Sequence, residues 1–261
     1  STLRENWNDI MENKDSPFLN RATSGLYAPG SSFKVLTAMA ILDSPNVDKE
    51  YNCKGSTKID GYILKDYSGK PHGQMNLENA LVKSCNTYFA EKGVEVGKDK
   101  LGEVLDGFMI NKNIPFDLPT QKSTFPYKEN LGKTDIAAAS IGQGKVLVTP
   151  LNMAMVASGI ANNGEIMKPI LVKEAISPDG KVIKAFHPEL LSKATDVFTA
   201  NEVKNMMVEV VKRGTGTNAA IKNIRVAGKT GTAENPSGKA HAWFIGFAPA
   251  DDPQIAIAVV L

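Results

Sequence analysis

The sequence predicts an α+β fold in which helices come first and an antiparallel sheet comes last. Two features of the hydrophobic pattern support this prediction. Between residues 31 and 211 most apolar runs recur at the three- and four-residue spacing of helices. The last 40 residues instead hold three short β-rich segments, which Gly, Pro and Asp turns separate.

Each helix follows from a local pattern along the chain. Helices are expected over 3–11, 31–42, 76–96, 100–108, 135–141, 151–162 and 201–211. The second of them starts at Ser31, because the turn Tyr27-Ala28-Pro29-Gly30 ends the preceding segment. The third is interrupted by Ser84-Cys85-Asn86.

The β-segments lie between and after these helices. Residues 44–74, rich in Gly, Asp and Lys, are expected to hold loops and small strands outside the core. A β-ribbon is expected from 170–173 and 182–183 around the turn Pro178-Asp179-Gly180. Strands over 224–233, 241–248 and 254–261 then form a three-stranded antiparallel meander.

The composition is that of a globular protein. The chain has 261 residues, 42% of them hydrophobic, and a net charge of +2, which predict one or two domains and argue against nucleic-acid binding. No apolar run reaches the ~18 residues of a membrane helix, and the absence of an initial Met suggests an excised fragment. Cys53 and Cys85 cannot form a disulfide framework and lack histidines at zinc-ligand spacing, so neither a metal nor a cofactor is expected.

Three short motifs stand out: Ser31-Ser32-Phe33-Lys34, Ser84-Cys85-Asn86 and Lys229-Thr230-Gly231-Thr232. Each is weak alone, because a chain of this composition contains about one or two Ser-x-x-Lys matches and about one Ser-x-Asn match by chance. Ser44-Pro45-Asn46 is such an accidental match. Order and setting therefore carry the functional hypothesis.

Ser31 and Lys34 have the pattern of a nucleophile and its base. They lie three residues apart at a helix start, and hence on one face. The positive end of the helix dipole lowers the pKa of Lys34, so that its amine can activate the Ser31 hydroxyl, a weak nucleophile on its own. The backbone N–H of Ser31 is a candidate oxyanion donor.

The Lys229 segment has the pattern of a recognition strand. Alternation puts Lys229 and Gly231 on one face and Thr230 on the other, and Gly231 leaves room for a substrate backbone. These groups suit an extended peptide that ends in a carboxylate. Gln143 either lines the same cleft or belongs to a tight turn between two glycines, and both interpretations stay open.

With these motifs, the chain resembles the transpeptidase domain of class B penicillin-binding proteins, within the penicilloyl-serine transferase group that also contains the serine β-lactamases. Further stretches that resemble the family in the same order are 20–23, 26–30, 141–144, 149–151, 214–217 and 241–249.

The resemblance implies a β-lactamase/transpeptidase-like fold, an antiparallel sheet flanked by helices, in a single domain over 1–261. A mostly helical subdomain is expected at about 35–205 and a sheet subdomain at about 206–261. Two further strands, a C-terminal helix, a membrane anchor and a pedestal domain are expected outside this chain. The sheet is then incomplete, the domain is truncated at both ends, and the activity of this piece alone is uncertain.

For the catalytic residues, the resemblance implies that Ser31 is the acylated nucleophile and Lys34 its general base. Ser84 would relay a proton to the leaving amine. Asn86 would hold Ser84 and contact both Lys34 and the substrate amide, and Lys229 would supply positive potential.

For substrate binding, the resemblance implies that Thr230, Gly231 and Thr232 line the site of the terminal carboxylate, with Gln143 as a further candidate in the cleft. The backbone N–H groups of Ser31 and Thr232 would form the oxyanion hole.

The implied function is that of a D,D-transpeptidase, which cross-links peptidoglycan stem peptides ending in D-Ala-D-Ala through an acyl-serine and is inhibited by β-lactams. Other cell-wall synthesis proteins are expected partners, through regions outside this chain, at the outer face of the bacterial cytoplasmic membrane. A D,D-carboxypeptidase or β-lactamase, and a non-catalytic β-lactam sensor or structural module, are the alternatives. No Glu-x-x-Leu-Asn segment follows Asn86, which favours a stable acyl-enzyme over a class A β-lactamase.

Overall fold

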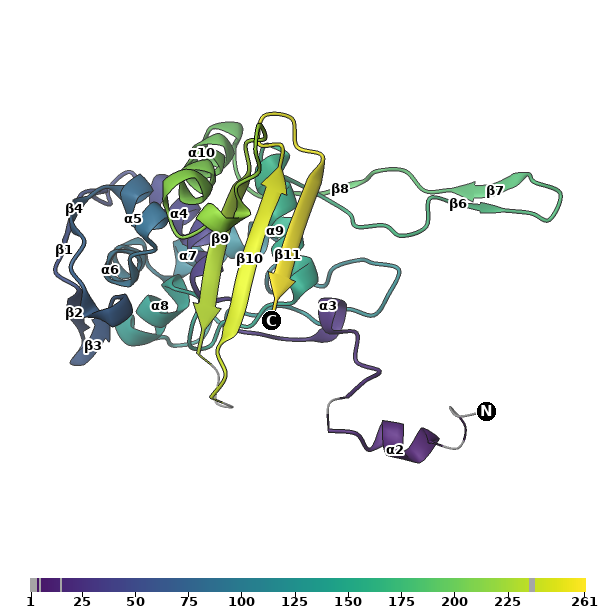
Figure 1. Cartoon of the computed structure of the whole chain (residues 1–261), viewed down its shortest axis with the longest axis horizontal. Helices are drawn as coiled ribbons and strands as arrows, with labels where there is room; N and C mark the ends of the chain where they lie inside the picture. Colours follow the sequence, from purple (N-terminus) through teal and green to yellow (C-terminus); the bar gives the residue numbers. More distant parts are fainter. Residues whose placement is uncertain (1–3, 5, 15, 235–237) are drawn as a thin grey trace.

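The computed structural model describes residues 4, 6–14, 16–234 and 238–261. Its helices are α2 (Trp7–Met11), α3 (Arg21–Ser24), α4 (Lys34–Leu42), α5 (Leu77–Lys83), α6 (Asn86–Val96), α7 (Lys98–Gly107), α8 (Lys133–Ser140), α9 (Pro150–Ala161) and α10 (Val197–Arg213), with 3₁₀ turns η1 (Gly30–Phe33), η2 (Tyr67–Gly69) and η3 (Thr217–Ala219). Figure 1 shows helices behind and beside the main sheet, with α2 and one hairpin extending away from this body.

In the described part of the chain, the strands form one three-stranded sheet and four small pairs. They are β1 (Tyr51–Cys53), β2 (Ser56–Ile59), β3 (Tyr62–Lys65), β4 (Gly73–Met75), β5 (Glu165–Met167), β6 (Glu174–Ile176), β7 (Val182–Ala185), β8 (Leu190–Lys193), β9 (Ala227–Ala233), β10 (His241–Ala248) and β11 (Ile255–Val260). The predicted α+β class is confirmed.

The main sheet is the predicted meander, with strand order β11-β10-β9 and antiparallel pairing throughout. Helix α9 packs against β10 and β11 and α10 packs against β9, so these two helices cover one face of the sheet (Figure 1). Strand β9 begins at Ala227 rather than at residue 224, because Ile221 and Ile224 form an isolated bridge with each other.

Helix α4 runs through the middle of the core. Every residue from Lys34 to Ile41 is buried, as expected for a helix that is apolar on almost all sides. Helices α6, α7 and α10 pack around it, and the Thr37 hydroxyl donates to the Ser140 carbonyl at the end of α8 (2.8 Å). The first turn of α4 therefore carries Lys34 into the interior.

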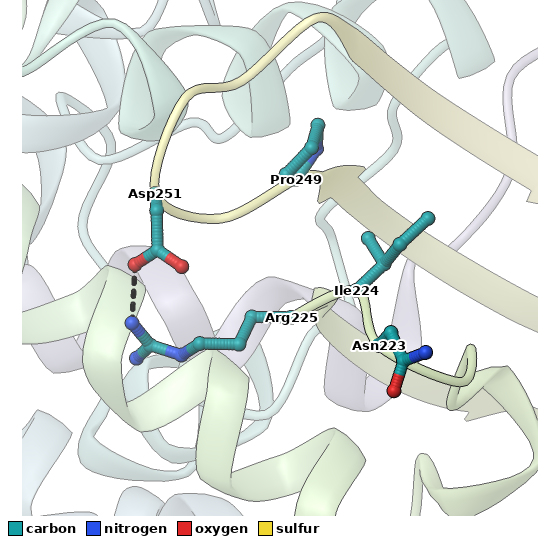
Figure 2. Close-up of a pocket in the computed structure, with 5 residues that line it drawn as sticks. All are labelled: Asn223, Ile224, Arg225, Pro249 and Asp251. Carbon is teal, nitrogen blue, oxygen red and sulfur yellow. Dashed lines mark hydrogen bonds and ion pairs between the residues drawn. The ribbon is translucent and has the colours of Figure 1, made fainter.

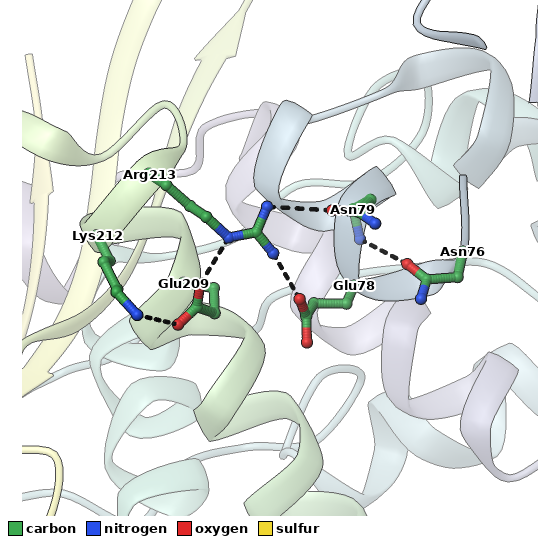
Figure 3. Close-up of polar contacts among 6 residues, drawn as sticks. All are labelled: Asn76, Glu78, Asn79, Glu209, Lys212 and Arg213. Carbon is green, nitrogen blue, oxygen red and sulfur yellow. Dashed lines mark hydrogen bonds and ion pairs between the residues drawn. The ribbon is translucent and has the colours of Figure 1, made fainter. Parts of the chain in front are cut away.

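Helix α10 holds α5 in place through polar contacts at its last turn. Arg213 donates to Glu209 in its own helix and to Glu78 and Asn79 in the first turn of α5 (Figure 3). The Asn76 side chain caps α5 by accepting the Asn79 backbone N–H. Such exposed ion pairs contribute little stability individually. Together they fix the position of α5 and of the interruption between α5 and α6 that follows it.

The prediction that residues 44–74 lie outside the core was wrong, because several of their side chains are buried in it. Strand β1 pairs with β4 and β2 pairs with β3, and Cys53, Ile59 and Leu64 are buried. In strands of three or four residues only one side chain faces inward, so the apolar signal is too sparse to stand out from the polar sequence around it.

The predicted β-ribbon is shifted along the chain. Its first strand is β6, which pairs with β7, whereas the backbone N–H groups of Leu171 and Val172 donate to the Asp117 carboxylate and so tie the expected strand to a loop. The pairing of β5 with β8, at the base of the extended hairpin, was not predicted.

At the N-terminus, the helix predicted over 3–11 is described from Trp7 to Met11, and residues 1–3 and 5 lie outside the described part. The short helix α3 was not predicted; the Asn20 side chain caps it by accepting the N–H groups of Ala22 and Thr23. None of the described helices is both long and apolar enough to cross a membrane. The division into two subdomains stays a prediction.

Truncation of a core leucine tests this packing. Leu105 in α7 is fully buried, whereas Ile183 on the extended hairpin is 70% exposed. Leu105→Ala should lower the free energy of unfolding by about 2–5 kcal/mol, since it removes buried contacts and leaves a cavity. Ile183→Ala should change it by less than about 0.5 kcal/mol. Denaturant unfolding of both variants measures the difference, and equal effects would contradict the placement of α7.

Candidate active site

The fold brings the three motifs together at the place where β9 meets η1. A Cβ atom on Gly30 would lie 2.4 Å from the Thr232 carbonyl oxygen, and one on Gly231 would lie 2.7 Å from the Pro29 carbonyl oxygen. Both distances are too short for any side chain, so the two backbones touch directly. Gly30 also has a φ of +54°, a conformation that favours glycine.

The turn that carries Ser31 is a 3₁₀ turn, and the α-helix proper starts only at Lys34. The prediction of a helix start at Ser31 is therefore correct to within one turn. The Ser32 hydroxyl donates to the Pro29 carbonyl (2.8 Å) and is buried. Ser31 is half-buried, and its hydroxyl makes no hydrogen bond with the described residues, which leaves it available to a ligand.

Lys34 is fully buried, and polar groups of the α5–α6 break surround its amine. The amine donates to Asn86 Oδ1 (2.7 Å), to the Ser84 carbonyl (2.8 Å) and more weakly to Ser84 Oγ (3.4 Å). Burial lowers the pKa of Lys34 to about 7. The predicted direction of the pKa shift is confirmed, and its largest cause is desolvation by burial.

Ser84 joins the two lysines. It ends α5 in the left-handed conformation (φ 55°, ψ 42°), which is uncommon for serine. In this conformation its carbonyl accepts from Lys34, while its hydroxyl lies 3.0 Å from the amine of Lys229. A break between helices, which the sequence predicted, is thus also the contact point of two motifs.

Lys229 is the second buried amine. It donates to Ser84 Oγ and to the Thr230 carbonyl (2.9 Å). Burial and the nearby amine of Lys34 hold the pKa of Lys229 well below its usual value. Both causes work against a charge on Lys229, and the positive potential expected at this position stays a prediction.

The remaining residues of β9 follow the predicted alternation. Lys229 and Gly231 are buried, Thr230 is half-buried and Thr232 is exposed. The hydroxyl of Thr230 lies 2.6 Å from that of Thr215, which belongs to the Gly-Thr-Gly-Thr segment after α10. The outward face of β9 therefore presents a group of hydroxyls next to the turn that carries Ser31.

Gln143 lies in a tight turn behind the same site. Gly142 and Gly144, on either side of it, have φ angles of +73° and +71°, and the Gln143 N–H donates to Ala138 at the end of α8. The Gly142 carbonyl accepts the Gly30 N–H (2.9 Å). The turn interpretation is confirmed, while a role of the half-buried Gln143 side chain in binding stays a prediction.

Asp66 is a buried residue of the site that sequence reasoning missed. One of its carboxylate oxygens accepts the backbone N–H groups of Asn86 and Thr87, and the other accepts the Thr87 hydroxyl (2.7 Å). Burial alone raises the pKa of Asp66, but hydrogen bonds from Cys53, Thr87 and Asn86 outweigh it, and the pKa lies below its usual value. Twenty residues separate the partners, so no local pattern reveals them.

A pocket of about 540 Å³ lies elsewhere, before the start of β9 and after the end of β10. It is lined by Asn223, Ile224, Arg225, Pro249 and Asp251, and the ion pair of Arg225 with Asp251 spans one side of it (Figure 2). None of the motif residues lines it, so it is separate from the site.

Comparison with known proteins agrees with this geometry. A family model described as the penicillin binding protein transpeptidase domain matches residues 3–261. The chain is 35% identical to the peptidoglycan D,D-transpeptidase PbpA of Mycolicibacterium smegmatis, over 98% of this chain and 54% of that protein. The chain therefore spans about half the length of this curated relative.

Two solved structures are similar over 99% of this chain. One is the D,D-transpeptidase domain of a peptidoglycan glycosyltransferase from Eggerthella lenta, with a TM-score of 0.92 and 36% sequence identity. The match covers 66% of that chain. The other is penicillin-binding protein A from M. tuberculosis as an imipenem acyl-enzyme complex, with a TM-score of 0.92 and 33% sequence identity. The match covers 60% of that chain.

The pH dependence of stability tests the state of Lys34. Its pKa is about 7 in the folded chain against an ordinary value of 10.5, so between these pH values the unfolded chain binds one more proton and unfolding becomes less favourable as pH rises. The free energy of unfolding of the wild type minus that of Lys34→Met should therefore increase from pH 7 to about 10. Denaturant titrations over this range measure it.

Lys222→Met, which removes an exposed lysine, is the matched control and should show no such trend. A difference between the wild type and Lys34→Met that stays constant over the whole range would mean that Lys34 keeps an ordinary pKa.

Proposed function

Because the chain belongs to the penicillin-binding protein transpeptidase domain family, we propose that it is a serine D,D-transpeptidase that cross-links peptidoglycan stem peptides and is inhibited by β-lactams. The observation that carries this proposal is the buried amine of Lys34, which has a lowered pKa and lies one turn from Ser31. A partly neutral amine at neutral pH can take the proton of a serine hydroxyl.

In the first half of the proposed reaction, Ser31 Oγ attacks the carbonyl carbon of the D-Ala-D-Ala bond, and Lys34 accepts the hydroxyl proton. The hydrogen bond between the two forms when substrate is bound, since catalytic contacts are often loose in a free enzyme. Hydrogen bonds to Asn86 Oδ1 and to the Ser84 carbonyl already fix the position of the Lys34 amine in the free chain.

The leaving D-Ala needs a proton on its amine as the C–N bond breaks. Ser84 is the proposed relay, because its hydroxyl contacts the amines of both Lys34 and Lys229. The proton taken from Ser31 can thus pass from Lys34 through Ser84 to the leaving nitrogen, which leaves an acyl ester on Ser31 and releases D-Ala.

Substrate binding is assigned to the outward face of β9. The hydroxyls of Thr230 and Thr232 suit the terminal carboxylate, and the direct contact of Gly231 with the η1 backbone keeps this strand close to Ser31. The backbone N–H groups of Ser31 and Thr232 are the proposed oxyanion donors. When its amine is protonated, Lys229 adds positive potential next to the proposed carboxylate site.

In the second half, an amine from a neighbouring stem peptide attacks the ester carbonyl and gives up a proton to Lys34. The C–O bond to Ser31 breaks, Ser31 Oγ takes a proton back, and the new amide closes the cross-link. A β-lactam would acylate Ser31 in the same way as the donor peptide, which is supported by the imipenem acyl-enzyme of the M. tuberculosis relative.

We place the whole protein at the outer face of the cytoplasmic membrane with other cell-wall synthesis proteins.

Covalent labelling tests the nucleophile. The wild-type chain incubated with benzylpenicillin should gain the mass of one penicilloyl group, and Ser31→Ala should gain none, because it lacks the proposed nucleophile. Ser32→Ala is the matched control: its hydroxyl points to the Pro29 carbonyl, so the adduct should remain. Intact-mass spectrometry reads all three.

With a donor peptide ending in D-Ala-D-Ala and an amine acceptor, the same wild-type chain should release D-Ala and form the cross-linked product. A folded wild type that takes up no penicillin would sink the proposal, and release of D-Ala without any amine product would favour a carboxypeptidase.

The proposed relay is tested by removing each of the two Ser-x-Asn serines. Ser84→Ala should slow acylation by penicillin about 10²–10⁴-fold, the usual contribution of one positioned proton-transfer group. Ser44→Ala should leave the rate unchanged, because the Ser44 hydroxyl only donates to the Ala40 carbonyl at the end of α4. Stopped-flow rates decide, and an unaltered rate in Ser84→Ala would remove Ser84 from the mechanism.

A further inference from the structure

The turn that carries Ser31 has to keep a fixed position relative to β9, because the two proposed oxyanion donors lie on different elements. One is the backbone N–H of Ser31 in η1, and the other is that of Thr232 in β9. Both must point at the same oxygen atom, and a donor that is displaced from this position loses much of its effect. The contacts that hold the turn on the sheet therefore bear on the reaction.

Two of the bonds that hold this turn come from outside the sheet. Tyr27 pairs with Val148 in an isolated bridge, and the Gly30 N–H donates to the Gly142 carbonyl (2.9 Å). Both partners belong to the segment between α8 and α9. These bonds fix the turn relative to that segment, but they do not fix it relative to β9.

The direct contact between the turn and β9 sets how closely the two can approach. It is made by backbone atoms that face Gly30 and Gly231. Among the described residues, no backbone hydrogen bond joins residues 28–33 to β9. Contact of this kind resists closer approach steeply, whereas each atom pair adds only a weak attraction against separation. A directional bond between sheet and turn has to come from a side chain.

Trp243 in β10 supplies such a bond. Its indole N–H donates to the Ala28 carbonyl (3.0 Å). Trp243 lies directly opposite Gly231 in the pairing of β10 with β9, and a buried indole usually has a hydrogen-bond partner. Ala28 precedes Ser31 by three residues, so the bond reaches the turn close to the proposed nucleophile.

Gly231 makes room for this arrangement. Side chains of residues that are paired across an antiparallel sheet lie on the same face, so Trp243 fills the space that Gly231 leaves open. A Cβ atom on Gly231 would lie 2.8 Å from the Ser32 backbone nitrogen and 3.1 Å from Trp243 Cβ. The ring of Tyr27 packs edge-on against the indole, with centroids 6.3 Å apart, and Trp243 is 3% exposed. The indole is therefore held in place beside the turn.

We propose that Trp243 is a positioning residue of the acylation reaction. Its bond to the Ala28 carbonyl holds the turn at the distance from β9 at which the N–H groups of Ser31 and Thr232 form one oxyanion hole. Trp243 acts through the turn and does not touch the substrate. Donors that are held in place before the reaction need not move as negative charge develops, which is what makes them effective. The inference rests on the proposed function, because it concerns the proposed oxyanion hole.

The test removes the indole N–H and keeps an aromatic ring. Trp243→Phe loses the donor. Incorporation of benzothienylalanine, which has nearly the shape of tryptophan with sulfur in place of the N–H, loses the donor without changing the packing. This incorporation is made in the Trp7→Phe chain, because the sequence contains two tryptophans. Trp7→Phe alone is the matched control, since Trp7 lies in α2, away from the sheet (Figure 1).

Stopped-flow acylation by benzylpenicillin separates the affinity of the noncovalent complex from the rate of acylation. Both replacements of Trp243 should lower the acylation rate about 10–10²-fold, because a misplacement of about 1 Å at a reacting centre costs up to about 10²-fold. The affinity of the noncovalent complex should stay unchanged. Trp7→Phe should match the wild type in both quantities.

Phenylacetamidomethylboronic acid, which carries the side chain of benzylpenicillin, tests the oxyanion hole at equilibrium. Its boron bonds to Ser31 Oγ with release of the hydroxyl proton and becomes tetrahedral, which places one boron-bound oxygen in the hole. Both replacements of Trp243 should weaken its binding by a factor similar to the loss in acylation rate. A residue that only supports the core would not weaken the boronate adduct selectively.

These measurements distinguish failure of this inference from failure of the proposed function. A wild type that takes up no penicillin would overturn both. A wild type that is acylated at Ser31, with both replacements of Trp243 acylated at the same rate, would overturn this inference alone. Equal losses in noncovalent affinity and in acylation rate would also overturn it, because Trp243 would then act through packing of the site as a whole.

Discussion

The burial of two amines against one serine is the constraint on which the rest of the site depends. Lys34 and Lys229 enter the interior from different elements, a helix and a strand, and both reach the hydroxyl of Ser84. Neither has a carboxylate as its direct partner among the described residues, so the cost of removing each charge from water appears as a lowered pKa. An interior built in this way gives up stability to keep an amine that can accept a proton, as functional sites commonly do.

The supporting structure is arranged so that Ser84 cannot move away. Arg213 holds the start of α5, Asp66 holds the start of α6, and the left-handed conformation of Ser84 lies between these two fixed helices. On the other side, β9 touches the η1 turn backbone to backbone. The reactive residues therefore come from three elements that are each anchored independently, which is how a site keeps its geometry without a single rigid scaffold.

The sequence predicts well what is local and poorly what is not. The helices, the final meander and the three motifs could be predicted because spacing and turn residues lie within a few positions of each other. The cause of the lowered pKa of Lys34 could not, since it depends on how deeply α4 is buried. Asp66 was missed for the same reason: its partner Asn86 lies 20 residues away along the chain, and only the fold brings the two together.

The direct contact of Gly231 with the η1 turn also limits how the site can adapt in shape. Where side chains line both walls of a cleft, a bulky ligand gains room when one of them rotates. Here the facing walls are main chain, and main chain has no rotamers. Widening the gap between Gly30 and Thr232 requires β9 to shift as a unit, and β9 is bonded along its length to β10. Any change in this contact is therefore a displacement of the sheet edge as a whole, which the packing of α9 and α10 against the sheet opposes.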